Sequence, residues 1–184
     1  MKHYYNKIQS DNWFDYSTMY EQAVKRASDN AHFVEVGTWK GMSAIFMAVE
    51  IINSGKNIKF DCVDTWDLTP TQSDIPESKY KNLFNIFQKN IEPVKHIINP
   101  VKSISWDAAD LYNDESLDFV FIDAGHDYIS VTKDLTAWWP KVKKGGLIAG
   151  HDYNNKFKVK EAVHDFFKTN NAQSKTLSCW EVTK

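Results

Sequence analysis

The sequence contains 184 residues, of which 42% are hydrophobic and 25% charged, values typical of one globular domain with a sizeable core. The formal net charge of −2 provides no basic surface for a polyanion, which argues against nucleic acid and anionic membranes as partners. The chain has two cysteines, Cys62 and Cys179, and shows neither a secretory signal nor an apolar run of bilayer length. We therefore expect reduced thiols and a cytoplasmic location.

Helical and extended periodicities alternate along the chain. In chain order, the pattern predicts a helix over 17–28, a strand over 32–36, a helix over 42–52, a strand over 58–63, a helix over 79–90, a strand over 94–98, a short helix over 105–112, a strand over 117–122, a helix over 130–139, a strand over 146–149, a helix over 159–168 and an extended segment over 176–182. This alternation indicates an α/β fold, with a Rossmann-like, mostly parallel sheet, helices on both faces and a single domain. The polar stretch 64–78 is predicted to be a long loop.

A glycine-containing loop joins the first strand to the next helix in FVEVGTWKGMSAIFMA. Gly37 and Gly41 allow a ligand to approach the backbone closely, and the following helix N-terminus favours an anionic group. Ser43, in the first turn, could help to hold a carboxylate. The spacing is neither GxGxxG nor that of a P-loop, which argues against a dinucleotide or a nucleoside triphosphate.

Asp64 ends the second predicted strand, FDCVD. An acidic residue at this place in an α/β sheet commonly accepts hydrogen bonds from the two hydroxyls of a ribose. The alternative is a carboxylate that caps a helix or is solvated in the loop. Together with the glycine loop, Asp64 indicates a ligand with an adenosine end and an amino-acid or phosphate end.

The pentapeptide AGHDY occurs twice, at 124–128 and at 149–153. Each copy follows a predicted strand. Because parallel strands joined by right-handed crossovers end at one edge of the sheet, both copies are expected there. The flanking sequences do not repeat, so the repeated pentapeptide does not indicate a solenoid protein.

The two AGHDY segments carry acidic and imidazole side chains. Asp123, His151 and Asp152 are predicted to converge on one ion, either Mg²⁺ or Mn²⁺, and the imidazole shifts the preference slightly toward a transition metal. His126 would be a general base, since the ordinary pKa of histidine lies near working pH. The alternatives are loop caps for the carboxylates and a solvated histidine. Asp127 is a candidate cap for the helix that follows.

Four segments resemble the class I S-adenosylmethionine-dependent methyltransferases: EVGTWKGMSA, VDTW, SWDAADLY and DFVFIDAGHDYISVTKDLTAWWPKVKKGGLIAGHDY. The most similar branch is the small metal-dependent O-methyltransferases, which includes catechol O-methyltransferase-like enzymes and the macrolide sugar O-methyltransferases. The resemblance runs from about Phe33 to Tyr153. The segment 170–184 is short for the two final strands common in this fold, which predicts an abbreviated sheet edge.

The resemblance implies a role for each matching residue. The implied S-adenosylmethionine site comprises Glu35, Gly37, Thr38, Trp39, Gly41, Ser43, Asp64, Ser105, Trp106 and Asp123. The implied metal ligands are Asp123, His151 and Asp152, although the family usually has acidic or amide residues where His151 stands. His126 occupies the position of the catalytic lysine of catechol-type enzymes and of a histidine in some sugar methyltransferases.

The resulting hypothesis is metal-assisted O-methylation of a small-molecule hydroxyl on a sugar, a catechol or a secondary metabolite. Residues 1–30 would form a helical cap over the acceptor site of a methyltransferase domain at 31–184, and Trp66, Trp13 or Phe14 would stack on the acceptor. Trp138 and Trp139 are expected to be packing residues. Because the family often dimerises, a homodimer is one expected assembly.

Three other readings stay open from the sequence. A methyltransferase fold could bind a cofactor or a partner without turnover. A metal-dependent hydrolase could use the same aspartates and histidines, but it leaves the glycine loop and Asp64 unexplained. An NAD-dependent oxidoreductase ranks last because GxGxxG is missing.

Overall fold

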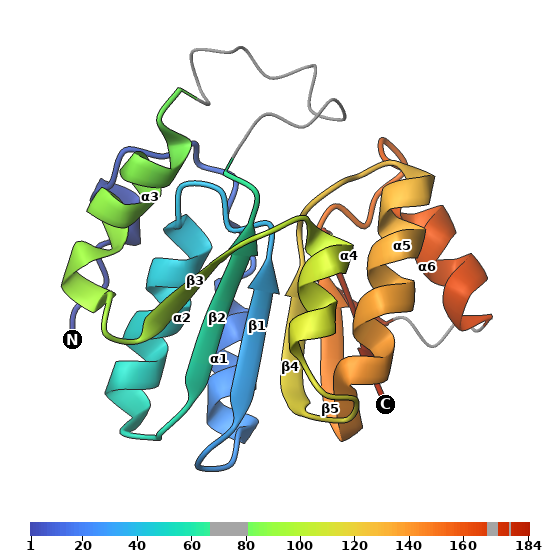
Figure 1. Cartoon of the computed structure of the whole chain (residues 1–184), viewed down its shortest axis with the longest axis horizontal. Coiled ribbons are helices and arrows are strands. Elements are labelled where there is room, and N and C mark those ends of the chain that lie inside the picture. The colour runs from blue at the N-terminus through green and yellow to red at the C-terminus, as the bar shows by residue number, and fades with distance from the viewer. Residues whose placement is uncertain (67–80, 169–172, 177) are drawn as a thin grey trace.

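The computed structural model describes residues 1–66, 81–168, 173–176 and 178–184. Its centre is one sheet with the strand order β3-β2-β1-β4-β5-β7-β6 (Figure 1). The strands are β1 (His32–Val36), β2 (Lys59–Asp64), β3 (Ile98–Lys102), β4 (Leu117–Ile122), β5 (Val142–Gly150), β6 (Gln173–Thr176) and β7 (Cys179–Thr183). The first five strands pair in parallel and the last two are antiparallel. The predicted α/β fold with a mostly parallel sheet is confirmed.

Helices cover both faces of the sheet (Figure 1). They are α1 (Ser17–Arg26), α2 (Met42–Ser54), α3 (Leu83–Ile91), α4 (Ser105–Ala108), α5 (Tyr128–Trp138) and α6 (Val159–Phe167), with short 3₁₀ helices at Tyr5–Lys7, Glu92–Val94, Ala109–Leu111 and Trp139–Lys141. Across the described ranges, no helix combines the length and apolarity needed to cross a bilayer.

The sheet separates two apolar cores. Phe33 of β1 packs in a cluster with α1, α2 and α3, whereas Val34 and Val36 pack in a second cluster with α5 and α6. Successive side chains of a strand point to opposite faces, so one five-residue strand contributes to both cores. The near-continuous apolar run of β4, LDFVFI, follows from the same burial on both faces.

The third strand begins four residues later than predicted. Val94 ends a 3₁₀ helix that contains Pro93, and β3 starts only at Ile98. β3 is an edge strand, where Pro100 is tolerated because one side of the strand has no partner to receive an N–H. Its mostly exposed residues lack the apolar run on which the prediction relied.

The far edge of the sheet differs from the predicted abbreviated one. Both final strands are present, β6 with four residues and β7 with five. β7 pairs with β5 from Leu147 to Gly150, which places the start of β7 beside the end of β5. The predicted loop at 64–78 and the predicted start of α3 at 79–80 lie largely outside the described residues.

Candidate active site

The two AGHDY segments lie side by side at the carboxyl edge of the sheet. β4 and β5 are parallel neighbours with Ile122 opposite Gly150, so Asp123 and His151 follow at the same level. The backbone continues this pairing, since the N–H of His151 donates to the carbonyl of Ile122 at 3.1 Å. The strand order reverses between β1 and β4, the place in such sheets where ligands bind.

Four side chains from these segments face one another. His126 Nε2 lies 3.0 Å from Asp152 Oδ2 and 3.6 Å from Asp123 Oδ1. His151 Nδ1 lies 3.6 Å from each of the same two oxygens. Donor atoms of Asp123, His126 and Asp152 all lie within 4.8 Å of one another, close enough to share one ion. The structure therefore gathers the three predicted ligands and adds His126 as a fourth donor.

The four groups are strongly coupled electrostatically. Burial disfavours the charged forms, but the facing carboxylates of Asp123 and Asp152 outweigh it and raise the pKa of His126 to about 9 and that of His151 to about 11. The same contacts lower the pKa of Asp123 and bring that of Asp152 well below its ordinary range, against the opposing effect of burial. In this cluster each carboxylate thus favours the charged form of the imidazoles, and each imidazole favours the charged form of the carboxylates. A divalent cation would reverse this balance by favouring neutral imidazoles.

The segment before α1 lies over the cluster of Asp123, His126, His151 and Asp152. The hydroxyl of Tyr16 donates to Asp123 Oδ2 at 3.2 Å, and His151 Nε2 lies 3.1 Å from Asp15 Oδ1. Tyr16 is 3% exposed and packs on Phe121 of β4. The sequence analysis placed this segment near the acceptor but missed both residues, because no local pattern marks a contact across more than 100 residues.

The glycine loop presses against the same edge of the sheet. Gly37 has φ +89°, and a Cβ there would lie 2.0 Å from the carbonyl oxygen of Asp123. Gly41 has φ +86° and is the N-cap residue of α2. Both glycines are required by backbone conformation, and Gly37 also by space. Thr38 is 2% exposed, and its hydroxyl donates to the carbonyl of Val63 at 3.4 Å.

Glu35 and Ser43, two predicted cofactor contacts, lie beneath the loop. Glu35 is 1% exposed and accepts hydrogen bonds from Ser43 Oγ at 2.6 Å and from the Tyr20 hydroxyl at 3.1 Å. The three residues join β1, α2 and α1. In this arrangement Ser43 and Glu35 are hydrogen-bonded to each other. Their roles in binding a cofactor stay predictions.

Replacing Glu35 with glutamine should flatten the pH dependence of stability. Burial raises the pKa of Glu35 from 4.5 to about 8, partly offset by the Ser43 and Tyr20 hydrogen bonds. Between pH 4.5 and about 8, the Glu35 carboxyl is therefore protonated in the folded protein but ionised in the unfolded chain. The stabilisation is fully present below pH 4.5 and is lost as the pH rises toward 8. Urea unfolding of both proteins should show wild type losing up to ~1.4 kcal/mol per pH unit relative to Glu35→Gln. Parallel profiles would contradict a buried protonated Glu35.

Asp64 lies at the end of β2 beside the loop. Its two carboxylate oxygens accept the backbone N–H of Trp39 at 2.8 Å and of Trp66 at 2.7 Å. A carboxylate oxygen accepts more than one hydrogen bond, so these contacts orient Asp64 and leave it able to receive the hydroxyls of a ribose. The chemistry of this half-buried acceptor fits the predicted role.

Ser105 and Trp106 begin α4, and a residue that the sequence analysis did not select lies behind them. Ser105 Oγ donates to Asp134 Oδ1, and Lys133 Nζ lies 4.5 Å from the centre of the Trp106 ring. Asp134 is fully buried, which raises its pKa to about 7 although the Ser105 hydrogen bond opposes the change. The signal was present in the sequence, as an acid on the apolar face between Val131 and Leu135.

The aromatic residues divide between packing and exposure. Trp66 is 3% exposed, packs against Phe84 and Phe87, and donates from Nε1 to the carbonyl of Trp39 at 3.0 Å. Stacking of Trp66 on an acceptor, as predicted, does not fit this burial. Trp13 is 51% exposed and its ring lies 5.8 Å from that of Trp39, so it stays a candidate.

The remaining predicted packing residues lie as expected. Trp138 is fully buried and Trp139 packs edge-on against Phe167. Phe14, which was predicted to stack on the acceptor, is partly buried and packs against Tyr16 and Phe46 at the edge of the core. Asp127 caps α5 by accepting the N–H groups of Ile129 and Ser130, as anticipated.

The chain belongs to the methyltransferase domain family, whose model matches residues 34–153. This match covers the glycine loop, Asp64 and both AGHDY segments. Together with the fold, it identifies the protein as an S-adenosylmethionine-dependent methyltransferase of class I. The comparison with curated proteins gave no significant match.

Solved structures share the fold at low sequence identity. The O-methyltransferase NovP is 17% identical, with a TM-score of 0.69 over 91% of this chain and 78% of NovP. CalS11, a TDP-rhamnose 3′-O-methyltransferase of calicheamicin biosynthesis, is 14% identical, with a TM-score of 0.61 over 90% of this chain and 76% of CalS11. A putative rRNA methylase from Clostridium thermocellum is 13% identical, with a TM-score of 0.61 over 89% of this chain and 93% of that protein.

Proposed function

We propose that the protein transfers a methyl group from S-adenosylmethionine to a hydroxyl oxygen of a small molecule, assisted by a divalent metal ion. The observation that carries this proposal is the set of facing donor atoms of Asp123, His126, His151 and Asp152, next to the glycine loop.

The residues fit a divalent ion. His126 Nε2 is buried and, within the described part of the chain, is not aligned for a hydrogen bond, although Asp152 lies 3.0 Å away. Within 4.8 Å of ligand atoms of Asp123 and Asp152, this nitrogen is placed to take up a proton beside a bound ion. Asp123, Asp152 and His151 would hold the ion, with His126 beside them. Bound there, the ion would act as a Lewis acid that lowers the pKa of the acceptor hydroxyl and fixes its position.

The chain's own residues would orient the two reactants. Gly37 and Asp64 would position the cofactor, and the segment with Asp15 and Tyr16 would cover the acceptor and exclude water. His126 would accept the hydroxyl proton at an imidazole nitrogen as the oxygen attacks the methyl carbon, the methyl–sulfur bond breaks and S-adenosylhomocysteine leaves. Holding both reactants in line supplies much of the rate gain in such transfers.

The proposed acceptor is a sugar, a catechol or a secondary metabolite. The net charge of −2 disfavours RNA, despite the rRNA methylase among the structural neighbours. The likeness to NovP and CalS11 supports a hydroxyl acceptor, and CalS11 is a methyltransferase of TDP-rhamnose, a nucleotide sugar. A cytoplasmic location and a homodimer remain parts of this proposal.

Calorimetry with S-adenosylhomocysteine tests the cofactor site first. We expect micromolar binding to the wild type, loss of binding in Asp64→Ala, and no change in Asp114→Ala, which removes an exposed carboxylate that pairs with Lys141. Mg²⁺ and Mn²⁺ are then added, followed by an acceptor screen with sugar nucleotides, catechols and an RNA oligonucleotide. Absence of cofactor binding would overturn the proposal, and methylation of the RNA alone would replace its acceptor class.

A further inference from the structure

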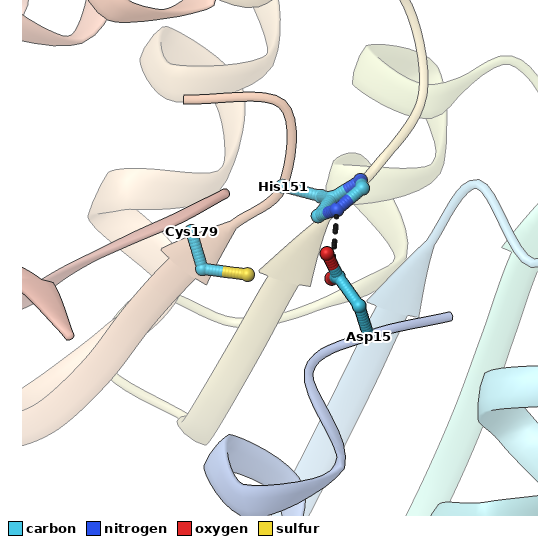
Figure 2. A group of neighbouring side chains, drawn as sticks. All are labelled: Asp15, His151 and Cys179. Atoms are coloured by element: carbon cyan, nitrogen blue, oxygen red, sulfur yellow. Dashed lines mark hydrogen bonds and ion pairs between the residues drawn. The ribbon is translucent and has the colours of Figure 1, made fainter. Parts of the chain in front are cut away.

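A second group of metal-ligating side chains lies behind His151. Asp15 precedes α1, His151 follows β5, and Cys179 begins β7. Their ligand atoms all lie within 4.8 Å of one another, and His151 Nε2 is 3.1 Å from Asp15 Oδ1. Figure 2 shows the thiol of Cys179 pointing toward this pair. Cys179 has no role in the proposed methyl transfer, and Asp15 enters it only as part of the segment that would cover the acceptor.

We infer that Asp15, His151 and Cys179 form a binding site for a thiophilic divalent ion of the zinc class. A carboxylate oxygen, an imidazole nitrogen and a thiolate sulfur together suit Zn²⁺, whereas Mg²⁺ and Ca²⁺ take oxygen ligands. Ligand atoms around one tetrahedral Zn²⁺ lie about 3.3–3.8 Å apart. The observed span of 4.8 Å or less requires only small side-chain movements. Three protein ligands leave a fourth position for water.

The surroundings of His151 favour this site. Histidines that bind a metal through one nitrogen usually direct the other toward a carboxylate, which fixes the ring. Here Nε2 faces the Asp15 and Cys179 side, while Nδ1 lies 3.6 Å from Asp123 and from Asp152. The carboxylates of the first cluster would therefore orient the ligand of the second.

The site is open to solvent on the Asp15 side and buried on the Cys179 side. The Asp15 side chain is 59% exposed, which gives an ion a route from solvent, whereas Cys179 is fully buried. Ser178 Oγ donates to Asp15 Oδ1 at 3.0 Å and helps to place the carboxylate. Ion binding would release the thiol proton and fasten the segment before α1 to β5 and β7. Because His151 also faces Asp123 and Asp152, occupation of this site would constrain the first cluster.

Co²⁺ is the probe, because thiolate coordination gives a sulfur-to-cobalt charge-transfer band that oxygen or nitrogen ligands do not produce. Titration of the full chain with Co²⁺ should produce this band. Added Zn²⁺ should displace the Co²⁺ and remove the band. Cys179→Ala should abolish the band. Cys62→Ala is the matched control, since Cys62 is equally buried but lies in β2, which β1, β4 and β5 separate from β7 in the sheet. The control should retain it.

Two further variants separate this site from the first cluster. Asp15→Asn changes an exposed side chain, so folding is not at risk, and should weaken Co²⁺ binding at least as much as the ~10–100-fold loss seen for outer-shell partners. Asp123→Asn should keep the band, because Asp152 still faces His151 Nδ1 at 3.6 Å. Co²⁺ binding without the band, or a band that persists in Cys179→Ala, would overturn the inference. Neither result depends on methyl transfer, so the proposed function stands or falls separately.

Discussion

Gly37→Ala should be among the most damaging single substitutions in this protein. Its Cβ would lie 2.0 Å from the carbonyl oxygen of Asp123, and the residue has φ +89°. The left-handed conformation costs an alanine roughly 1–2 kcal/mol, and the overlap with rigid backbone adds about 1–3 kcal/mol. A total loss of roughly 2–5 kcal/mol is a large part of the ~5–15 kcal/mol that stabilises a domain.

Urea unfolding followed by circular dichroism measures this loss, and S-adenosylhomocysteine titration measures its effect on the cofactor site. Gly55→Ala is the matched control, because Gly55 also has positive φ (+69°) but would place its Cβ in open space. We expect the control to lose only about 1 kcal/mol and to keep cofactor binding. Equal losses in the two variants would show that the contact with Asp123 does not matter.

Asp123→Asn should remove metal binding and methyl transfer together. Asp123 faces both His126 and His151 and accepts a hydrogen bond from the Tyr16 hydroxyl, so it links three groups at the proposed metal site. Asparagine has nearly the same shape but lacks the negative charge. Since loss of an outer-shell partner alone costs about 10–100-fold, we expect Mn²⁺ affinity and transfer rate to fall on the order of 100-fold or more.

Mn²⁺ titration by calorimetry tests this without knowledge of the acceptor, and methyl transfer can be added once one is found. Asp127→Asn is the control, because Asp127 lies only four residues after Asp123 but caps α5. Asparagine caps helices about as well as aspartate, so Mn²⁺ affinity should stay within about twofold of wild type. Unchanged Mn²⁺ affinity in Asp123→Asn would remove the metal from the proposed mechanism.

The sequence determined the main architecture because its signals are local. The apolar run of β4, the glycine loop before α2 and the strand-then-AGHDY pattern each specify an element from adjacent residues, and parallel topology then places Asp123 and His151 at one edge. The predicted start of β3 was wrong because an exposed edge strand carries no such local pattern.

Contacts between distant segments were decided only by the tertiary structure. Asp15 and Tyr16 reach the site from a segment more than 100 residues away, and Cys179 arrives on β7 because that strand turns back to pair with β5. The same packing buries Trp66 and turns Glu35 toward Ser43 and Tyr20. Residue type and spacing indicate which chemistry is available, but which side chains face one another depends on how the helices and strands pack, and neighbouring residues do not encode that.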